Sequence, residues 1–300
     1  MKSRGARAGA AGRALFVATL AVGAYMTLPA ACARQRPAVS GAELSRVERW
    51  WIVIGASRFL ESADWRHHGR DTQMVVLSGD SPVPLGQLPA DTIRLAYLSV
   101  GETDAQSSTW RAVKDQSFIV EPNPNWPGNM RVDIRDERWQ QLLLRQEVPR
   151  LLTMGFDGLM LDTLDTVPYL ESKDPSRFAG SRRALADWLR ALRRIAPRAV
   201  VIANGTESLI DAAPFVDGFV VEGVFAMYDF GRRVYRATTD DERAWKLAVV
   251  GRARSVAPRP VFSIEYADVG DIHLGRWAAD EAAKHGFRPY VSVKDLNVLP

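Results

Sequence analysis

The sequence predicts a single (β/α)8 TIM barrel that follows an N-terminal signal segment. Eight short runs rich in β-branched and aromatic residues recur between residues 50 and 293, and helical patterns separate the later runs. Continuously apolar strands that alternate with helices indicate a parallel sheet covered by helices, and eight such units indicate a closed barrel. An open doubly wound sheet is the alternative. The barrel is favoured because no G-x-G-x-x-G turn follows the first run.

Residues 1–32 are predicted to be an export signal. Lys2, Arg4, Arg7 and Arg13 precede an apolar run over residues 14–31, which is the pattern of a signal peptide. The run is close to the roughly 20 apolar residues that span a membrane, so an uncleaved N-terminal anchor is a second interpretation. We therefore expect an exported protein, whether secreted, periplasmic or anchored to a membrane.

Cys32, the only cysteine, ends this run in the sequence LPAACA. The sequence resembles a bacterial lipoprotein cleavage site, in which the cysteine is lipidated, although Pro29 stands where that pattern has leucine. Ala31 and Ala33 also satisfy the small-residue rule of ordinary signal peptidase. Lipidation of Cys32, with membrane attachment through the lipid, and plain secretion are both open.

Charge and composition exclude several classes of partner and cofactor. The chain has 39 Lys and Arg against 35 Asp and Glu, and the four basic residues before residue 32 account for the excess. The remaining chain is neutral, so we expect no nucleic-acid binding. We also expect no metal and no cofactor, because no cysteine follows Cys32, and the four histidines do not form a ligand cluster. His67 and His68 are adjacent, and His273 and His285 are expected at the surface.

We interpret residues 33–48 as a linker and residues 49–300 as the barrel domain. The predicted strands are 50–56, 73–79, 93–100, 156–162, 199–205, 216–222, 260–266 and 288–293. The predicted helices are 136–154, 181–196, 240–256 and 275–285, and Pro149 is expected to kink or split the first of them. Residues 58–71 and 80–91 are expected to be loops or short helical turns.

Two similar octets end in acids. GFDGLMLD at residues 155–162 returns as FVDGFVVE at residues 215–222, so Asp162 and Glu222 each follow an apolar strand. Active sites of TIM barrels form at the carboxyl ends of the strands, which places both acids at one rim. A single acid after a strand is more often a helix cap, but this rim carries more than one.

Three further polar residues follow other strands. Glu102 ends the third strand, Asn204 the fifth, and Glu265 lies near the end of the seventh. Strand alternation is interpreted to place Glu265 on the inward face with Ser263, and Glu102 on the inward face with Val100. Carboxylates that are held close raise one another's pKa, which is how an acid/base pair is built.

The arrangement indicates glycoside hydrolysis, which requires one ionised carboxylate and one protonated carboxyl beside the scissile bond. Asp162 is the predicted nucleophile and Glu222 the predicted acid/base. Retention or inversion depends on their separation, which the sequence leaves open. Tyr97, Trp126 and Tyr228 are candidates for stacking on sugar rings, with packing as the alternative role for each.

These residues lie in segments that resemble glycoside hydrolase family 114, the endo-α-1,4-polygalactosaminidase-like family of TIM barrels. The matching segments are AYLSVGE (96–102), WPGNMRVDIRDERW (126–139), GFDGLMLDTLD (155–165), ANG (203–205) and DGFVVE (217–222). The resemblance implies hydrolysis of an α-1,4-linked galactosamine-rich polysaccharide by Asp162 and Glu222. It also implies that Asp165, Glu102 and Asn204 line the site. Thr163 departs from the family, which commonly has asparagine there.

Two other functions compete with this one. A metal-dependent de-N-acetylase of the same kind of polymer would require clustered His and Asp ligands, which the four histidines do not suggest. A non-catalytic envelope protein or lipoprotein that binds glycan in a hydrolase-derived cleft would have lost one acid of the pair, and both acids are present. The sequence makes no prediction of oligomeric state.

Overall fold

The computed structural model describes residues 38–54 and 70–298, with the exception of residues 82, 84, 106 and 108. The predicted signal segment, Cys32, His67 and His68 lie outside the described residues. Within the described part of the chain, no helix combines the length and the apolar character that crossing a membrane requires.

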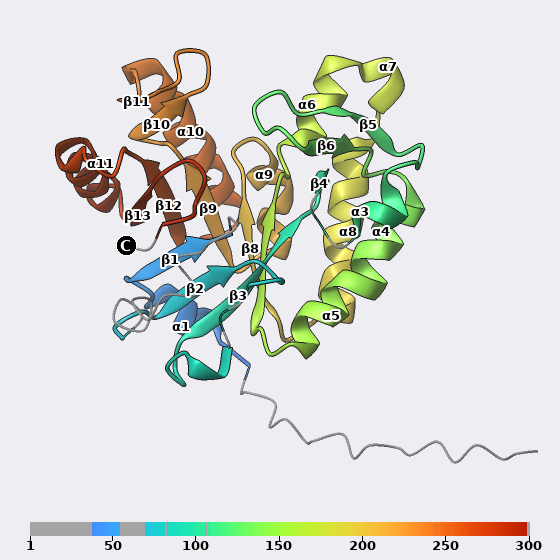
Figure 1. Ribbon diagram of the computed structural model, residues 1–300, viewed down its shortest axis with the longest axis horizontal. Helices are drawn as coiled ribbons and strands as arrows, with labels where there is room; N and C mark the ends of the chain where they lie inside the picture. The colour runs from blue at the N-terminus through green and yellow to red at the C-terminus, as the bar shows by residue number, and fades with distance from the viewer. Residues whose placement is uncertain are drawn as a thin grey trace, which may run out of the picture. The chain divides into compact units, whose positions relative to one another are not determined.

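The described residues form an eight-stranded parallel sheet that curls into a nearly closed barrel, as Figure 1 shows. The sheet order is β1-β2-β3-β7-β8-β9-β12-β13, which is also the order along the chain, so the barrel is confirmed over the doubly wound alternative. The strands are β1 (Trp50–Val53), β2 (Met74–Leu77), β3 (Ile93–Ser99), β7 (Gly158–Asp162), β8 (Val200–Asn204), β9 (Gly218–Glu222), β12 (Val261–Tyr266) and β13 (Arg288–Ser292).

Side chains close the seam between β1 and β13. The Trp50 Nε1 donates to the carbonyl of Arg288 at 3.0 Å. The Trp50 ring also packs 5.7 Å from the ring of Tyr290. Both contacts join the first strand to the last, so the Trp50 side chain bridges the gap between β1 and β13.

Helices cover the outside of the barrel, and the four predicted helical segments are present. The helices are α1 (Gly41–Ser45), α3 (Trp110–Val113), α4 (Glu137–Leu142), α5 (Val148–Thr153), α6 (Thr166–Lys173), α7 (Pro175–Phe178), α8 (Ser181–Ile195), α9 (Ser208–Ala212), α10 (Asp240–Val256) and α11 (Ile272–Lys284). Short 3-10 turns are η2 (Leu85–Gln87) and η4 (Ala213–Phe215). The first of these turns lies within residues 80–91, where a loop or short helical turn is predicted.

A π-helical segment, η3 (Leu143–Glu147), separates α4 from α5. Pro149 stands at the start of α5. Proline has no N–H for the bond to the residue four positions earlier, so an uninterrupted α-helix is disfavoured there. The predicted split of the helix over residues 136–154 is therefore present as a π turn.

The described part of the predicted linker belongs to the fold, which corrects the boundary at residue 49. Ser40 and Glu43 form a capping box at the start of α1. Leu44 and Val47 are buried in the core. A Cβ atom on Gly218, at the start of β9, would lie 3.4 Å from the Leu44 side chain, so α1 packs at the amino-terminal end of the barrel. Burial of two apolar side chains holds this segment against the sheet.

Two antiparallel structures extend the connections that follow β3 and β9. After β3 the chain forms a three-stranded sheet of order β4-β6-β5, from β4 (Glu102–Asp104), β5 (Ile119–Pro122) and β6 (Asn129–Val132). After β9 it forms a hairpin of β10 (Ala226–Asp229) and β11 (Val234–Ala237). Both leave the barrel at its carboxyl end, and we refer to them below as the two wall structures.

Candidate active site

A pocket of about 840 Å³ opens at the carboxyl ends of the barrel strands. Strand ends supply its central polar side chains: Tyr97 from β3, Asp162 from β7, Asn204 from β8, Glu222 from β9 and Tyr266 from β12. Five strands of the rigid sheet therefore hold these side chains, a placement that fixes side chains better than loops do.

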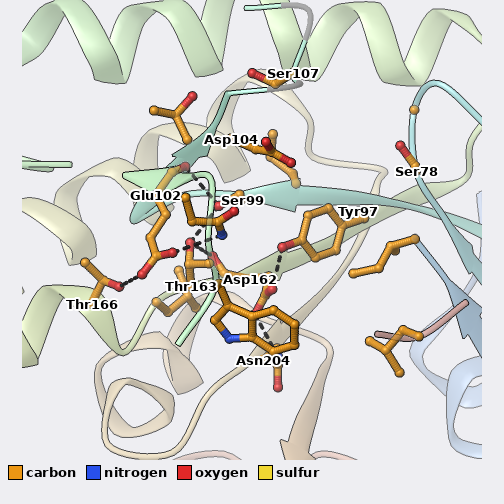
Figure 2. Close-up of a pocket in the computed structure, with 18 of the residues that line it drawn as sticks. Ser78, Tyr97, Ser99, Glu102, Asp104, Ser107, Asp162, Thr163, Thr166 and Asn204 are labelled. Carbon is orange, nitrogen blue, oxygen red and sulfur yellow. Dashed lines mark hydrogen bonds between the residues drawn. The ribbon is translucent and has the colours of Figure 1, made fainter. Parts of the chain in front are cut away.

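Asn204 joins the two predicted catalytic acids. Its Nδ2 donates to Asp162 Oδ1 at 2.7 Å and to Glu222 Oε1 at 2.5 Å. The sum of these lengths, 5.2 Å, is the largest separation that the two oxygens can have. Figure 2 shows Asn204 and Tyr97 both directed at Asp162. The predicted convergence of Asp162, Asn204 and Glu222 is thus present in the structure.

A tyrosine hydroxyl donates to the second oxygen of each acid. Tyr97 OH donates to Asp162 Oδ2 at 2.6 Å, and Tyr266 OH donates to Glu222 Oε2 at 2.6 Å. Burial raises the pKa of both phenols well above the usual value, and the neighbouring carboxylates raise it further. The two tyrosines therefore keep their protons and act as donors.

Burial raises the pKa of both acids. For Asp162, hydrogen bonds from Tyr97, the Thr163 backbone and Asn204 oppose this rise. For Glu222, the charge of Asp162 is the second largest cause and adds to the rise. Two acids this close retain one proton between them over an intermediate pH range. More hydrogen-bond donors face Asp162 (Tyr97, the Thr163 backbone and Asn204) than face Glu222 (Tyr266 and Asn204), which favours the ionised form at Asp162 and the proton at Glu222.

Thr163 supports the site through its hydroxyl and an unusual backbone. Its φ of 60° lies in the left-handed region, where a β-branched residue is strained. Its Oγ1 accepts from the backbone N–H groups of Val100 and Gly101 at 3.1 and 2.8 Å. Thr163, which stands where the family commonly has asparagine, therefore fixes the turn after β3 beside Asp162.

Glu102 lies in the pocket wall, but it does not end the third barrel strand as predicted. The strand β3 ends at Ser99, and Glu102 begins β4. The carboxylate is 3% exposed and accepts from Asn123 Nδ2 at 2.9 Å, Asn129 Nδ2 at 3.1 Å and Thr166 Oγ1 at 2.8 Å. These donors are provided by the β5–β6 connection, β6 and α6, so Glu102 anchors the small sheet to the barrel.

Asp165 also lines the pocket, and the backbone uses both of its oxygens. The backbone N–H of Thr206 donates to Oδ2 at 2.8 Å, and that of Ser208 donates to Oδ1 at 3.0 Å. The hydroxyl of Ser208 donates to the same Oδ1 at 2.7 Å. Asp165 therefore fixes the loop between Asn204 and α9.

Glu265 does not face the pocket, so the inward placement predicted for it is wrong. The register pairs Ile264 with Glu222, which places Ile264 and Tyr266 on the pocket face and Glu265 on the opposite face. Glu265 is fully buried and accepts the backbone N–H groups of Phe225 and Ala226 at 2.8 and 3.0 Å. Burial raises its pKa to about 7. It holds the loop that leads from β9 into β10.

The two other aromatic candidates lie at one side of the mouth. Trp126 lines the pocket, and its ring lies 5.6 Å from that of Phe230 in the β10–β11 connection. Tyr228 packs against Phe230 and Tyr235 and does not line the pocket. The Nζ of Lys294 lies 5.5 Å from the rings of both Trp126 and Tyr228. Tyr228 thus supports the wall that Trp126 presents to the pocket.

Tyr266, Lys246 and Thr163 complete the pocket, although the sequence did not single out the first two as site residues. Tyr266 follows Glu265 in the run VFSIEY. If the opposite face of this strand had been assigned to the barrel interior, Tyr266 would have been predicted as a site residue. Lys246 lies inside an ordinary helical pattern, which carries no signal of a site. In the described residues, no three His, Cys, Asp or Glu side chains gather as a metal would require, and His273 and His285 are exposed.

A TIM barrel with two half-buried acids bridged at the carboxyl ends of its strands defines a glycosidase-like site. The sequence model described as glycoside-hydrolase family GH114 matches residues 78–299. The chain therefore belongs to glycoside hydrolase family GH114.

Two solved structures share the fold of this chain, and one further protein is similar to it in sequence. The glycoside hydrolase domain of PelA from Pseudomonas aeruginosa aligns with a TM-score of 0.71 and 24% identity, over 84% of this chain and 97% of that domain. Ega3 of Aspergillus fumigatus in complex with galactosamine aligns with a TM-score of 0.61 and 16% identity, over 88% and 95% of the two chains. An uncharacterized protein of Deinococcus radiodurans is 29% identical over 214 residues, which are 68% of this chain and 65% of the relative.

Proposed function

We propose that the protein is an exported glycoside hydrolase that cleaves an α-1,4-linked, galactosamine-rich polysaccharide through Asp162 and Glu222. The main observation behind the proposal is that the Asn204 amide donates to both acids and so holds them in the same pocket. Family membership supports the reaction class. A substrate of several sugar units suits a pocket of about 840 Å³.

The short separation of the acids favours a retaining mechanism. Retaining glycosidases have carboxyl groups about 5–5.5 Å apart, whereas inverting ones have them about 6.5–9.5 Å apart. The nearest oxygens of Asp162 and Glu222 lie within 5.2 Å. Asp162 attacks the anomeric carbon while Glu222 protonates the departing glycosidic oxygen. Glu222 then takes a proton from water, which attacks the same carbon and releases Asp162.

Charges around the mouth support a cationic amino sugar as the substrate unit. The pocket lining holds the acids Asp80, Asp104, Glu147, Asp162, Glu222 and Asp295 besides the fully engaged Glu102 and Asp165, against the bases Arg150, Lys246 and Lys294. This excess of acids attracts positive charge. The galactosamine bound to Ega3 is consistent with the same class of ligand.

Turnover of purified polygalactosamine by the wild type and by the variants Asp162→Asn and Glu222→Gln tests the proposal. We expect each substitution to lower kcat/KM by about 10²–10⁴-fold, the usual contribution of acid–base groups. Asp187→Asn and Glu137→Gln, the same chemical changes at exposed helical positions, should retain wild-type turnover. Product analysis by proton NMR should detect the α anomer first.

Three outcomes would contradict parts of this proposal. Equal turnover in the two pocket variants would remove the mechanism, and the β anomer as first product would remove retention. Binding of the polymer with no turnover of any glycan would support the non-catalytic envelope protein instead. For export, mass spectrometry of the mature N-terminus is expected to find cleavage near Cys32, and an added lipid mass would decide between lipidation and secretion.

A further inference from the structure

Lys246 reaches the backbone at the end of the strand that carries Glu222. Its Nζ donates to the carbonyl of Glu222 at 2.7 Å and to the carbonyl of Gly223 at 2.8 Å. Gly223 has φ of 57°, so the chain turns sharply where β9 ends. Lys246 also lines the pocket. Two of the three ammonium donors thus hold this turn.

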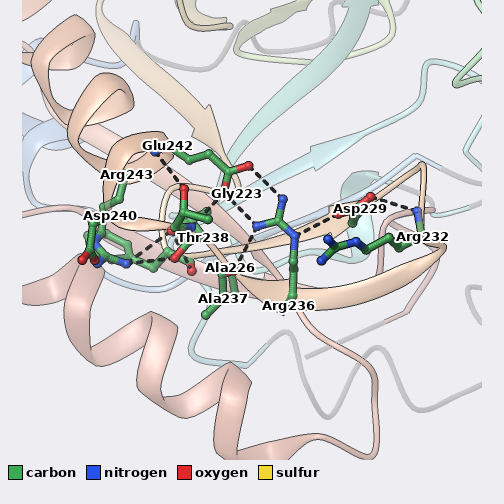
Figure 3. A network of polar contacts seen from close by, with 12 residues as sticks. Gly223, Ala226, Asp229, Arg232, Arg236, Ala237, Thr238, Asp240, Glu242 and Arg243 are labelled. Carbon is green, nitrogen blue, oxygen red and sulfur yellow. Dashed lines mark hydrogen bonds and ion pairs between the residues drawn. The ribbon is translucent and has the colours of Figure 1, made fainter.

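The helix that carries Lys246 is itself anchored to the mouth. Arg236 of β11 donates to both oxygens of Glu242 at 2.7 and 2.8 Å and to Asp229 at 3.0 Å. Glu242 also closes a capping box with Thr239 at the start of α10. Figure 3 shows this network beside Gly223 and Ala226. Glu242 precedes Lys246 by one helical turn, so the base of the lysine is fixed relative to the β10–β11 hairpin.

Charged groups surround Lys246 and Glu222 unequally. Lys246 faces four acids: Glu222 of β9, Glu265 of β12, Glu242 of its own helix α10 and Asp165 of the connection between β7 and α6. Burial lowers the pKa of Lys246, and these acids oppose the fall because they favour its charged form. The groups that face Glu222 are the charged Asp162 and Lys246 and the neutral Asn204, Tyr97 and Tyr266. Lys246 is the cation among them, and it lowers the pKa of Glu222 against burial and against Asp162.

We propose that Lys246 is a positioning residue of the reaction, which holds the turn after Glu222 and supplies the positive charge that offsets Asp162. The inference rests on the proposed function and deepens it. The Lys246 ammonium keeps its own protons throughout. The Glu222 carboxyl stays between Asn204 and Tyr266, gives its proton to the glycosidic oxygen as the carbon–oxygen bond breaks, and later regains one from water.

The pH profile of kcat/KM in Lys246→Met tests the proposal. Loss of a nearby positive charge raises the pKa of an acid. Because Glu222 must be protonated to act as acid, the alkaline limb of the profile should move up by about half a unit to one unit. We expect kcat/KM at the optimum to fall about tenfold or more, since the turn loses both donors. Lys246→Arg, which keeps the charge, should return the limb toward its wild-type position.

A control and a measurement that needs no substrate make the outcomes distinct. Lys284→Met, the same change at an exposed position of α11, should leave the profile unchanged. Carbon-13 NMR of carboxyl-labelled glutamate, assigned with Glu222→Gln, should find the Glu222 midpoint raised in Lys246→Met even if no glycan is hydrolysed. Lys246→Gln replaces Lys246→Met if the latter does not fold. A fall in kcat/KM with the limb and the NMR midpoint unmoved would overturn the proposal and leave only a structural role.

Discussion

At the scale of single residues, the centre of the pocket is a row of five side chains in which each carboxylate oxygen of Asp162 and Glu222 has a hydrogen-bond donor. Asn204 donates to one oxygen of Asp162 and one of Glu222, and Tyr97 and Tyr266 donate to the other two. Such donors favour the ionised carboxylate, whereas burial and the neighbouring acid favour the protonated one. The opposition explains how two half-buried acids coexist with a single proton between them.

Glu265 makes the folded state sensitive to pH. Its pKa is about 7 in the fold, because burial opposes its charge, against an ordinary value of 4.5. The folded state therefore binds the proton more tightly than the unfolded state, and the stability that Glu265 contributes is complete below pH 4.5 and is lost as pH rises through about 7.

Glu265→Gln should remove this dependence. Between pH 4.5 and 7.5 we expect the free energy of unfolding of the wild type to fall relative to the variant, by an amount on the order of 3 kcal/mol at 1.36 kcal/mol per unit of pKa. Chemical denaturation at several pH values measures the difference. Glu137→Gln, the same change at an exposed position, controls for residue type. Parallel curves for the wild type and Glu265→Gln would show that the carboxyl is ionised in the fold.

At the scale of secondary-structure elements, the sequence predicts the barrel strands well and their faces less well. The eight apolar runs became the eight strands, because a buried parallel strand is apolar on both faces and stands out from its surroundings. The same property hides its orientation. All six residues of β12 are buried, so the alternation that separates an inward from an outward face is absent, and Glu265 was placed where Tyr266 lies.

The two wall structures were not predicted, because their strands pair locally and are short. The strands β4, β5, β6, β10 and β11 have three or four residues each, and several of their side chains are exposed or half-buried. Such segments look like polar loops in a sequence. Asp162, Asn204 and Glu222 could be placed correctly because each ends a barrel strand. Lys246 could not, because its reach depends on the packing of α10.

Trp126 should matter more for polymer binding than for chemistry. It belongs to the connection between β5 and β6, and its ring meets Phe230 of the opposite wall beside the pocket. Aromatic rings of this kind bind the apolar faces of sugars and do not exchange protons. We expect Trp126→Ala to raise KM for a long polymer about fivefold to tenfold and to change kcat less than twofold.

Trp277, which is 38% exposed on α11, provides the matched control. Trp277→Ala should leave both constants near the wild-type values, as measured by steady-state kinetics on the same polymer. A fall in kcat with unchanged KM in Trp126→Ala would place the tryptophan among the groups that act on the transition state and would contradict its assignment to binding.

At the scale of the whole molecule, acidic and basic residues gather at different places, although their numbers are equal after residue 32. The chain after residue 32 is neutral, because the four excess basic residues precede it. The pocket nevertheless has an excess of acids, whereas exposed arginines such as Arg183, Arg190 and Arg194 lie on the outer face of α8. The field at the mouth is therefore negative although the net charge is near zero, and a cleft focuses such a field.

This separation predicts that salt weakens the reaction of a cationic polymer. We expect kcat/KM for deacetylated polygalactosamine to fall several-fold between about 20 and 500 mM NaCl, because screening lengths shorten from roughly 20 to 4 Å over that range. The fully acetylated polymer has no amine charge, so its kcat/KM should change little. Steady-state assays on the two polymers at matched chain length give the comparison. If kcat/KM depended on salt equally for the two polymers, the other pocket acids would act only on Asp162 and Glu222, and the natural substrate would be a neutral glycan.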